Sequence, residues 1–301
     1  MESLAGKNIA VVGAEDFGLA IAQSFQKQKA TVSLTGPNTT LIAEKAKKLN
    51  IRTDVQPMLN AVVSADLVLL ALPEAEIEST CKILAINLKK GAVIAHFSKV
   101  LDSTALDSAH KKPGVHTCSL YPVNKFYDLE ASQRILNNRL HRSYLYGEGD
   151  RAALKITDAM FKLIGFVPMT ISRESKPKYH AASVIASDYL TVLLEASMRI
   201  ASSTGVDGKL YWRSIQPLVK GTLESILQRG FDNTLGGPIM SGDTDTVANH
   251  LTALESVSSN LPALYANLGK HVLAHATQHN RLDKNTILKL HTVLNDIDTK
   301  K

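Results

Sequence analysis

The stretch from Asn8 to Gly18 reads NIAVVGAEDFG and decides the fold class. Its apolar part, Ile9 to Val12, has the length and the β-branched character of a buried strand. Gly13 then permits a tight turn, and the run from Leu19 to Lys29 predicts a helix after it. A strand, a glycine turn and a helix in this order are typical of the first unit of a parallel α/β sheet, and that turn is the usual place of a dinucleotide site.

Outward from this stretch, short apolar runs alternate with helical patterns as far as about residue 170. The predicted strands are residues 9–12, 32–34, 67–72, 93–96, 115–120, 144–146 and 167–170. This alternation predicts an α/β fold with a mostly parallel, Rossmann-type sheet. We therefore expect a dinucleotide-binding domain over residues 1–172.

After Ser172 the strand signal stops, and Pro177 opens a helical pattern that runs to Thr204. Further helices are predicted at residues 209–227, 243–258, 262–279 and 283–295, with a loop at residues 230–242. We expect residues 173–301 to form a second, all-α domain that completes a small-molecule site.

Composition bounds the function. The 301 residues are 45% hydrophobic and carry a net charge of +6, with the basic residues scattered. A mildly basic surface suits anionic small molecules, and no basic stripe with interleaved aromatic residues indicates nucleic acid.

The cysteines are only Cys81 and Cys118, which fits a reduced compartment. Residues 1–6 do not resemble a secretion signal, and the apolar stretch 181–194 contains Asp188. We expect a cytoplasmic protein that does not span a membrane.

Gly13 and Gly18 correspond to the first and third glycines of a dinucleotide fingerprint, whereas Glu15 occupies the middle position. The turn is either a working site or an ordinary βα turn whose site is lost, and its place at the first strand favours the former. The second predicted strand ends without the carboxylate that binds a ribose hydroxyl. The hydroxyls of Thr35 and Thr39 and the nearby Lys45 suit a 2′-phosphate, so NADP(H) is preferred over NAD. The predicted cofactor-binding residues are Gly13, Phe17, Gly18, Thr35, Asn38, Thr39, Leu72, Pro73 and Ser98.

Several segments carry a resemblance to a known family. They are His96-Phe97-Ser98, Ser119-Leu120-Tyr121-Pro122 with Phe126, Lys176 with Tyr179-His180-Ala181-Ala182, Ser187-Asp188-Tyr189, and the run from Leu235 to Leu251. In this order they resemble the Rossmann-like proteins with a C-terminal domain of unknown function 2520, distant relatives of ketopantoate reductase and pyrroline-carboxylate reductase. The family usually has glycine at Glu15 and Lys99, His at Tyr121, Asn at Asp188 and Arg at Ser241. The resemblance implies a cofactor-binding domain, a helical domain that also forms a homodimer, and a catalytic cleft between them.

Hydride transfer to a carbonyl or imine requires a positioned proton donor. Lys176 and His180 lie four residues apart and can project from one helix face. Lys176 would polarise a substrate oxygen or bind a carboxylate, His180 would donate the proton, and Asp188 would orient His180. Tyr121 completes the predicted catalytic set because it follows a predicted parallel strand. The alternative is that Lys176 is solvated and His180 packs at a domain boundary.

Metal chemistry is not expected, because no His, Cys and carboxylate cluster has metal-ligand spacing, and a pair such as His271 and His275 is typical of a helix face. The leading hypothesis is an NADP(H)-dependent reductase of a small 2-oxo acid of ketopantoate type. The alternatives are an imine reductase of pyrroline-carboxylate type and a non-catalytic nucleotide-binding homodimer with a degenerate site, which the departures at Glu15, Tyr121, Asp188 and Ser241 motivate.

Overall fold

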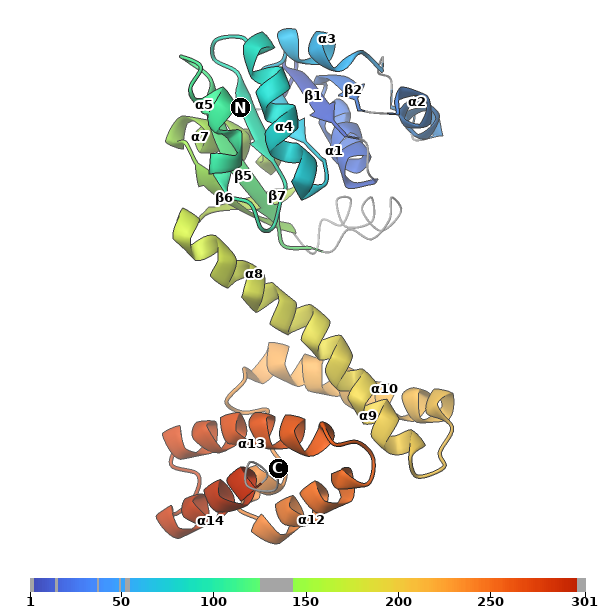
Figure 1. The fold of residues 1–301 in the computed structure, drawn as a ribbon, viewed down its shortest axis with the longest axis vertical. Coiled ribbons are helices and arrows are strands. Elements are labelled where there is room, and N and C mark those ends of the chain that lie inside the picture. The colour runs from blue at the N-terminus through green and yellow to red at the C-terminus, as the bar shows by residue number, and fades with distance from the viewer. Residues whose placement is uncertain are drawn as a thin grey trace. The chain divides into compact units, whose positions relative to one another are not determined.

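The computed structural model describes residues 3–13, 16–36, 38–48, 50–51, 55–124 and 143–296. The chain divides into two compact units, residues 1–184 and 185–301. The first contains the sheet and the second is helical (Figure 1). Strands end before residue 172, as the sequence predicts, and the first unit continues beyond that point through one further helix to Val184.

A seven-stranded sheet organises the first unit, in the order β2-β1-β3-β4-β5-β6-β7. Its strands are β1 Asn8–Val12, β2 Thr31–Thr35, β3 Leu67–Leu70, β4 Val93–His96, β5 His116–Pro122, β6 Ser143–Gly149 and β7 Phe166–Thr170. Only the β5–β6 pair among these is antiparallel. The predicted α/β class with a mostly parallel sheet is confirmed, and each predicted strand overlaps one observed strand.

Helices cover both faces of this sheet, which explains why its strands read as continuous apolar runs. The helices of this unit are α1 Asp16–Lys27, α2 Thr39–Lys48, α3 Met58–Val63, α4 Glu74–Leu84, α5 Asp107–His110, α7 Arg151–Leu163 and α8 Lys176–Val184. Along β1, Ile9 and Val11 belong to the core formed with α1 and α7, whereas Ala10 and Val12 belong to the core formed with α3 and α4. Alternate side chains therefore anchor opposite layers.

The strand order also locates a crevice. From β1 the chain proceeds to β2 on one side and then crosses to β3 on the other side of β1. Open α/β sheets bind ligands outside the carboxyl ends of the strands at such a switch point. The loops after β1 and β3, which begin at Gly13 and Ala71, lie at this position.

The second unit consists of helices, as predicted. They are the π-helical turn η4 Ile185–Tyr189, α9 Leu190–Ser202, α10 Gly208–Arg229, α11 Pro238–Ser241, α12 Thr244–Glu255, α13 Leu261–Gln278 and α14 Lys284–Asn295. The segment predicted as a loop at residues 230–242 contains the short helix α11. Ile239 of α11 packs with Val247, Leu273 and Leu290 of the next helices in a small core.

One helical run, Arg173–Ser202, is long and apolar enough to cross a membrane by length and composition, and 6% of its apolar window is buried. An exposed apolar helix is also what a protein–protein interface presents. The absence of a membrane span stays a prediction for this chain.

Candidate functional site

Two loops meet at the switch point because a glycine allows their backbones to approach. Gly13 has a φ of +88°, and a Cβ at this position would lie 2.1 Å from the carbonyl oxygen of Ala71. Its amide donates to the carbonyl of Thr35 at 2.8 Å. A Cβ on Gly18 would lie 2.9 Å from the Cβ of Ala71. Gly13 therefore makes the tight turn and Gly18 brings α1 close to the sheet, which are the roles of the first and third fingerprint glycines.

The end of β2 forms the next part of this edge. Thr35 is buried, and its hydroxyl has no hydrogen-bond partner among the described residues. Asn38 caps α2, since its side-chain oxygen accepts the amide of Leu41 at 3.0 Å. Thr39 is the first residue of α2. These positions combine one unused buried hydroxyl with a capped helix start.

Lys45, which the sequence assigns to a 2′-phosphate, is engaged in the structure. Its ammonium donates to the Asp16 carboxylate at 2.9 Å, and both side chains are about one-third exposed. Asp16 lies in the first turn of α1, where a carboxylate interacts favourably with the helix dipole. A phosphate that recruited Lys45 would therefore compete with Asp16.

The other predicted cofactor residues pack around the same loops. Phe17 lies edge-on to Phe97 at a centroid distance of 4.9 Å. The Leu72 side chain lies 2.8 Å from where a Cβ of Gly13 would stand, and Pro73 precedes the first turn of α4. All three lie at the carboxyl ends of β1 and β3. Glu15 and Phe126 lie outside the described residues.

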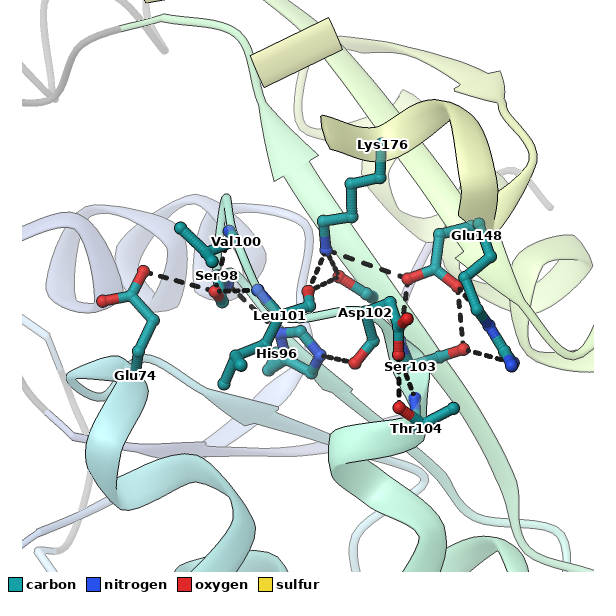
Figure 2. A network of polar contacts seen from close by, with 12 residues as sticks. Glu74, His96, Ser98, Val100, Leu101, Asp102, Ser103, Thr104, Glu148 and Lys176 are labelled. Carbon is teal, nitrogen blue, oxygen red and sulfur yellow. Dashed lines mark hydrogen bonds and ion pairs between the residues drawn. The ribbon is translucent and has the colours of Figure 1, made fainter. Parts of the chain in front are cut away.

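Ser98 orders the loop after β4 (Figure 2). Its hydroxyl donates to Glu74 at 3.2 Å and accepts the amides of Val100 at 3.1 Å and Leu101 at 2.8 Å. The Ser98 amide donates to Nδ1 of His96 at 3.2 Å, so the ring proton resides on Nε2, 3.0 Å from the Asp102 carbonyl. Burial, with the nearby Lys176 charge, lowers the His96 pKa to about 4. His96 is therefore neutral at physiological pH.

Lys176 is the most buried charged group of the site, with 1% of its surface exposed. Its ammonium donates to the Leu101 carbonyl and to the Ser119 hydroxyl, and lies 3.8 Å from the Glu148 carboxylate. Burial lowers the Lys176 pKa to about 8, and the Glu148 charge opposes that shift. The alternative of a solvated Lys176 is wrong, and the amine tethers the start of α8 to the sheet (Figure 2).

Glu148 on β6 is the counter-charge of this lysine, and the sequence analysis did not identify it. It is 2% exposed and accepts the amide and the hydroxyl of Ser103 at 2.8 and 2.7 Å. The Arg173 guanidinium lies 3.8 Å from the same carboxylate. Two hydrogen bonds from Ser103 and two cations therefore hold a carboxylate that would otherwise be costly to bury.

One face of β5 contacts one face of α8. Tyr121 lies two residues after Ser119 and therefore on the same side of the strand. The Tyr121 hydroxyl donates to Ser183 at 2.7 Å, and the ring of His180 lies edge-on to it at 6.1 Å. The structure thus brings together Tyr121, Lys176 and His180 of the predicted catalytic set. Tyr121 lies inside β5 and is buried, whereas the sequence analysis placed it after the strand.

Asp188 belongs to a different part of the chain from these three. It is exposed and lies in η4, within the second compact unit. Its predicted role of orienting His180 stays a prediction.

Residues 143–272 match the profile of the domain of unknown function DUF2520, and residues 8–97 match that of the coenzyme F420-dependent NADP oxidoreductases. This chain is a Rossmann-like protein with a DUF2520 domain. No functionally curated protein matches its sequence. The DUF2520 resemblance and the NADP oxidoreductase type of the first domain are confirmed.

Solved structures share the fold of this DUF2520-domain protein. A protein from Thermotoga maritima, TM1727, is 22% identical over 90% of this chain and 99% of its own, with a TM-score of 0.69. An imine reductase from Streptomyces aurantiacus is 15% identical over 94% and 99%, with a TM-score of 0.62. The pyrroline carboxylate reductase of Plasmodium falciparum, solved with NADP bound, is 11% identical over 99% of both chains, with a TM-score of 0.58.

The second unit contains a side-chain cluster that the sequence analysis did not expect. Donor atoms of Asp232, His275 and His279 all lie within 4.8 Å of one another. Sequence spacing did not single out this cluster, and the expectation that the protein has no metal chemistry stays a prediction. His271 and His275 lie four residues apart in the sequence, but in the structure His275 clusters with His279.

Proposed function

We propose that this protein is an NADP(H)-dependent reductase that acts on a small carbonyl or imine substrate. The close approach of Gly13 and Ala71 at the sheet's switch point carries the proposal, because a side chain at Gly13 would close the turn where a pyrophosphate binds in such folds. The unpartnered Thr35 hydroxyl at the neighbouring strand end is a further polar group for the cofactor.

The residues present fit a phosphorylated dinucleotide. Gly13 and Gly18 would hold the pyrophosphate turn, and Thr35, Asn38 and Thr39 would face the adenosine half. Lys45 would bind the 2′-phosphate of NADP(H) if its ammonium moved from the Asp16 carboxylate to the phosphate. The Asp16 carboxylate would then have to turn away, since it would repel a phosphate beside it. When bound, NADPH supplies the hydride.

Because Lys176 is buried, we assign different roles to Lys176 and His180. Within the described residues the Lys176 ammonium is enclosed by Leu101, Ser119 and Glu148, so it acts as a positioning residue that holds the start of α8 on β5. His180 is only half-buried, one turn further along, and histidine is the side chain best suited to proton transfer near neutral pH. We assign proton donation to the substrate to His180, with Tyr121 fixing its ring from the strand.

For the substrate we propose a 2-oxo acid of ketopantoate type. Its reduction leaves an alkoxide that His180 would protonate, and the mildly basic surface favours an anionic substrate. A cyclic imine of pyrroline-carboxylate type is the second candidate, favoured by the fold shared with imine and pyrroline carboxylate reductases. Glu15, which takes the middle position of the glycine fingerprint in the sequence, favours the third candidate, a nucleotide-binding protein without turnover.

Direct titration with NADPH and NADH, followed by addition of ketopantoate or 1-pyrroline-5-carboxylate, tests the proposal. NADPH is expected to bind more tightly than NADH and to be oxidised when one of the substrates is added. The absence of binding by both nucleotides would refute a working cofactor site. If NADPH binds but neither substrate causes its oxidation, the result would support a nucleotide-binding protein without turnover.

The role of His180 has a matched control in His116, at the amino end of β5. His180→Ala is expected to lower kcat by about 10²–10⁴-fold, the usual contribution of general acid catalysis, and to leave the Kd for NADPH unchanged. His116→Ala should leave both unchanged. A His180→Ala enzyme with the wild-type kcat would remove His180 from the mechanism.

We further infer that a second copy of the chain covers α9 and α10. Within the described chain, none of the 22 residues of α10 is buried, and an isolated helix gains most of its stability from packing. Large apolar side chains are exposed on these helices, namely Leu190, Val192, Leu210, Leu218, Leu223 and Leu227. Light scattering on the eluting protein is expected to give the mass of a homodimer, and Leu218→Glu with Leu227→Glu should shift it to the monomer.

A further inference from the structure

Asp232, His275 and His279 form a cluster in the second unit, built by two segments. His275 lies in the last turn of α13, His279 caps the C-terminal end of this helix one turn later, and Asp232 lies just after α10. Nε2 of His275 is 3.0 Å from the Asp232 carboxylate, and Nε2 of His279 is 3.6 Å from the same oxygen. The two imidazole rings stack at a centroid distance of 4.3 Å. Both histidines therefore direct the same ring nitrogen towards one carboxylate oxygen.

These separations match those between the ligands of a transition metal ion. Ligands about 2.0–2.1 Å from a Zn²⁺ ion are roughly 2.9–3.4 Å apart for angles between 90° and the tetrahedral value. The separation of 3.0 Å lies within that range, and the separation of 3.6 Å is slightly longer. Two imidazoles and one carboxylate also form the donor set of many Zn²⁺ and non-haem metal sites.

Pairing with Asp232 leaves part of this cluster unexplained. The Asp232 oxygen accepts a hydrogen bond from His275 only, because Nε2 of His279, at 3.6 Å, lies beyond hydrogen-bond distance. A cation between the three donors would engage both Nε2 atoms and the carboxylate together.

We propose that Asp232, His275 and His279 bind a divalent transition metal ion of the Zn²⁺ class. Three protein ligands leave a coordination position for water, since Asp232 and His279 are exposed. The ion would fasten the segment after α10 onto α13. Arg281 lies close enough for its charge to lower the Asp232 pKa, and the same charge opposes the binding of a cation.

The test is a zinc titration of the full-length chain without a purification tag, in competition with a chromophoric chelator. One Zn²⁺ per chain is expected. His275→Ala, His279→Ala and Asp232→Asn should each weaken binding by more than about tenfold, because loss of even a residue that only hydrogen-bonds to a metal ligand costs that much. Asp232→Asn keeps the shape of an exposed side chain, so its loss of affinity cannot be ascribed to unfolding.

His271→Ala is the matched control, since His271 is exposed one turn earlier on the same helix. It should bind zinc as the wild type does, and Arg281→Gln should bind it more tightly. The proposal is overturned if the wild type binds no stoichiometric zinc, or if His271→Ala weakens binding as much as His275→Ala. In either case the cluster is a surface His–Asp contact and nothing more.

Discussion

Lys176→Met tests whether the ammonium of this lysine is held in a buried site at an energetic cost. Burial lowers the Lys176 pKa from its ordinary value of 10.5 to about 8. Each unit of pKa difference between the folded and unfolded states corresponds to about 1.4 kcal/mol. Keeping the proton on Lys176 at neutral pH therefore costs about 3 kcal/mol of folding stability relative to the neutral amine.

The sign of the pH dependence follows from proton binding. Between pH 8 and 10.5 the unfolded chain binds a proton at Lys176 that the folded chain has released, so stability rises with pH in this window. The gain is complete above pH 10.5 and is lost as the pH falls through 8. In Lys176→Met this contribution disappears, so the difference in unfolding free energy between variant and wild type should change by about 3 kcal/mol across the window.

The two cysteines provide an assay for the first unit alone. Cys81 and Cys118 are both buried there, in α4 and β5, and labelling of Cys118 by a thiol reagent reports the opening of the sheet. The single tryptophan, Trp212, lies on α10 and reports the second unit, where no change is expected. Identical slopes for wild type and Lys176→Met between pH 8 and 10.5 would refute the buried-ammonium argument. The comparison uses the slope only, so an overall loss of stability in the variant does not affect it.

Three further substitutions test the site by different routes. Gly13→Ala should lose about 1–3 kcal/mol more stability than Gly91→Ala, because both glycines have positive φ but only at Gly13 would the Cβ meet the backbone of a neighbouring loop; equal losses in denaturant unfolding would contradict this. Thr35→Val should raise the stability of the free protein by about 1 kcal/mol, since it removes an unpartnered buried hydroxyl, and should weaken NADPH binding in calorimetry if that hydroxyl contacts the cofactor. Tyr121→Phe breaks the hydrogen bond to α8 but keeps the ring beside His180, so kcat should fall less than in His180→Ala, and a larger fall would make Tyr121 the proton donor.

The sheet was predictable because its strands are buried on both faces, and runs such as Leu67–Leu70 are uniformly apolar for that reason. The face shared by Lys176 and His180 was also predictable, because helical spacing is a local property. Glu148 was not predictable, since its partners Ser103 and Lys176 come from distant segments and only the sheet pairing brings them together. Sequence spacing suggests histidine pairs on a helix but does not show which pair a distant carboxylate will approach.

The burial of Lys176 changes what the sequence pattern means for chemistry. A lysine at the start of a helix was expected to contact substrate, yet its ammonium is saturated by a carbonyl, a hydroxyl and a carboxylate of the sheet. A buried charge held in this way contributes specificity of position more than stability, since its desolvation opposes its pairing. The network therefore fixes the rotation of α8 about its axis, and this rotation determines that His180 lies against Tyr121 at the carboxyl end of β5. The same edge of the sheet carries Ala71 two strands away and Gly13 three strands away. One sheet therefore places both the proposed proton donor and the proposed cofactor turn. The proposed chemistry is expected to depend on Glu148 even though Glu148 would not contact the substrate.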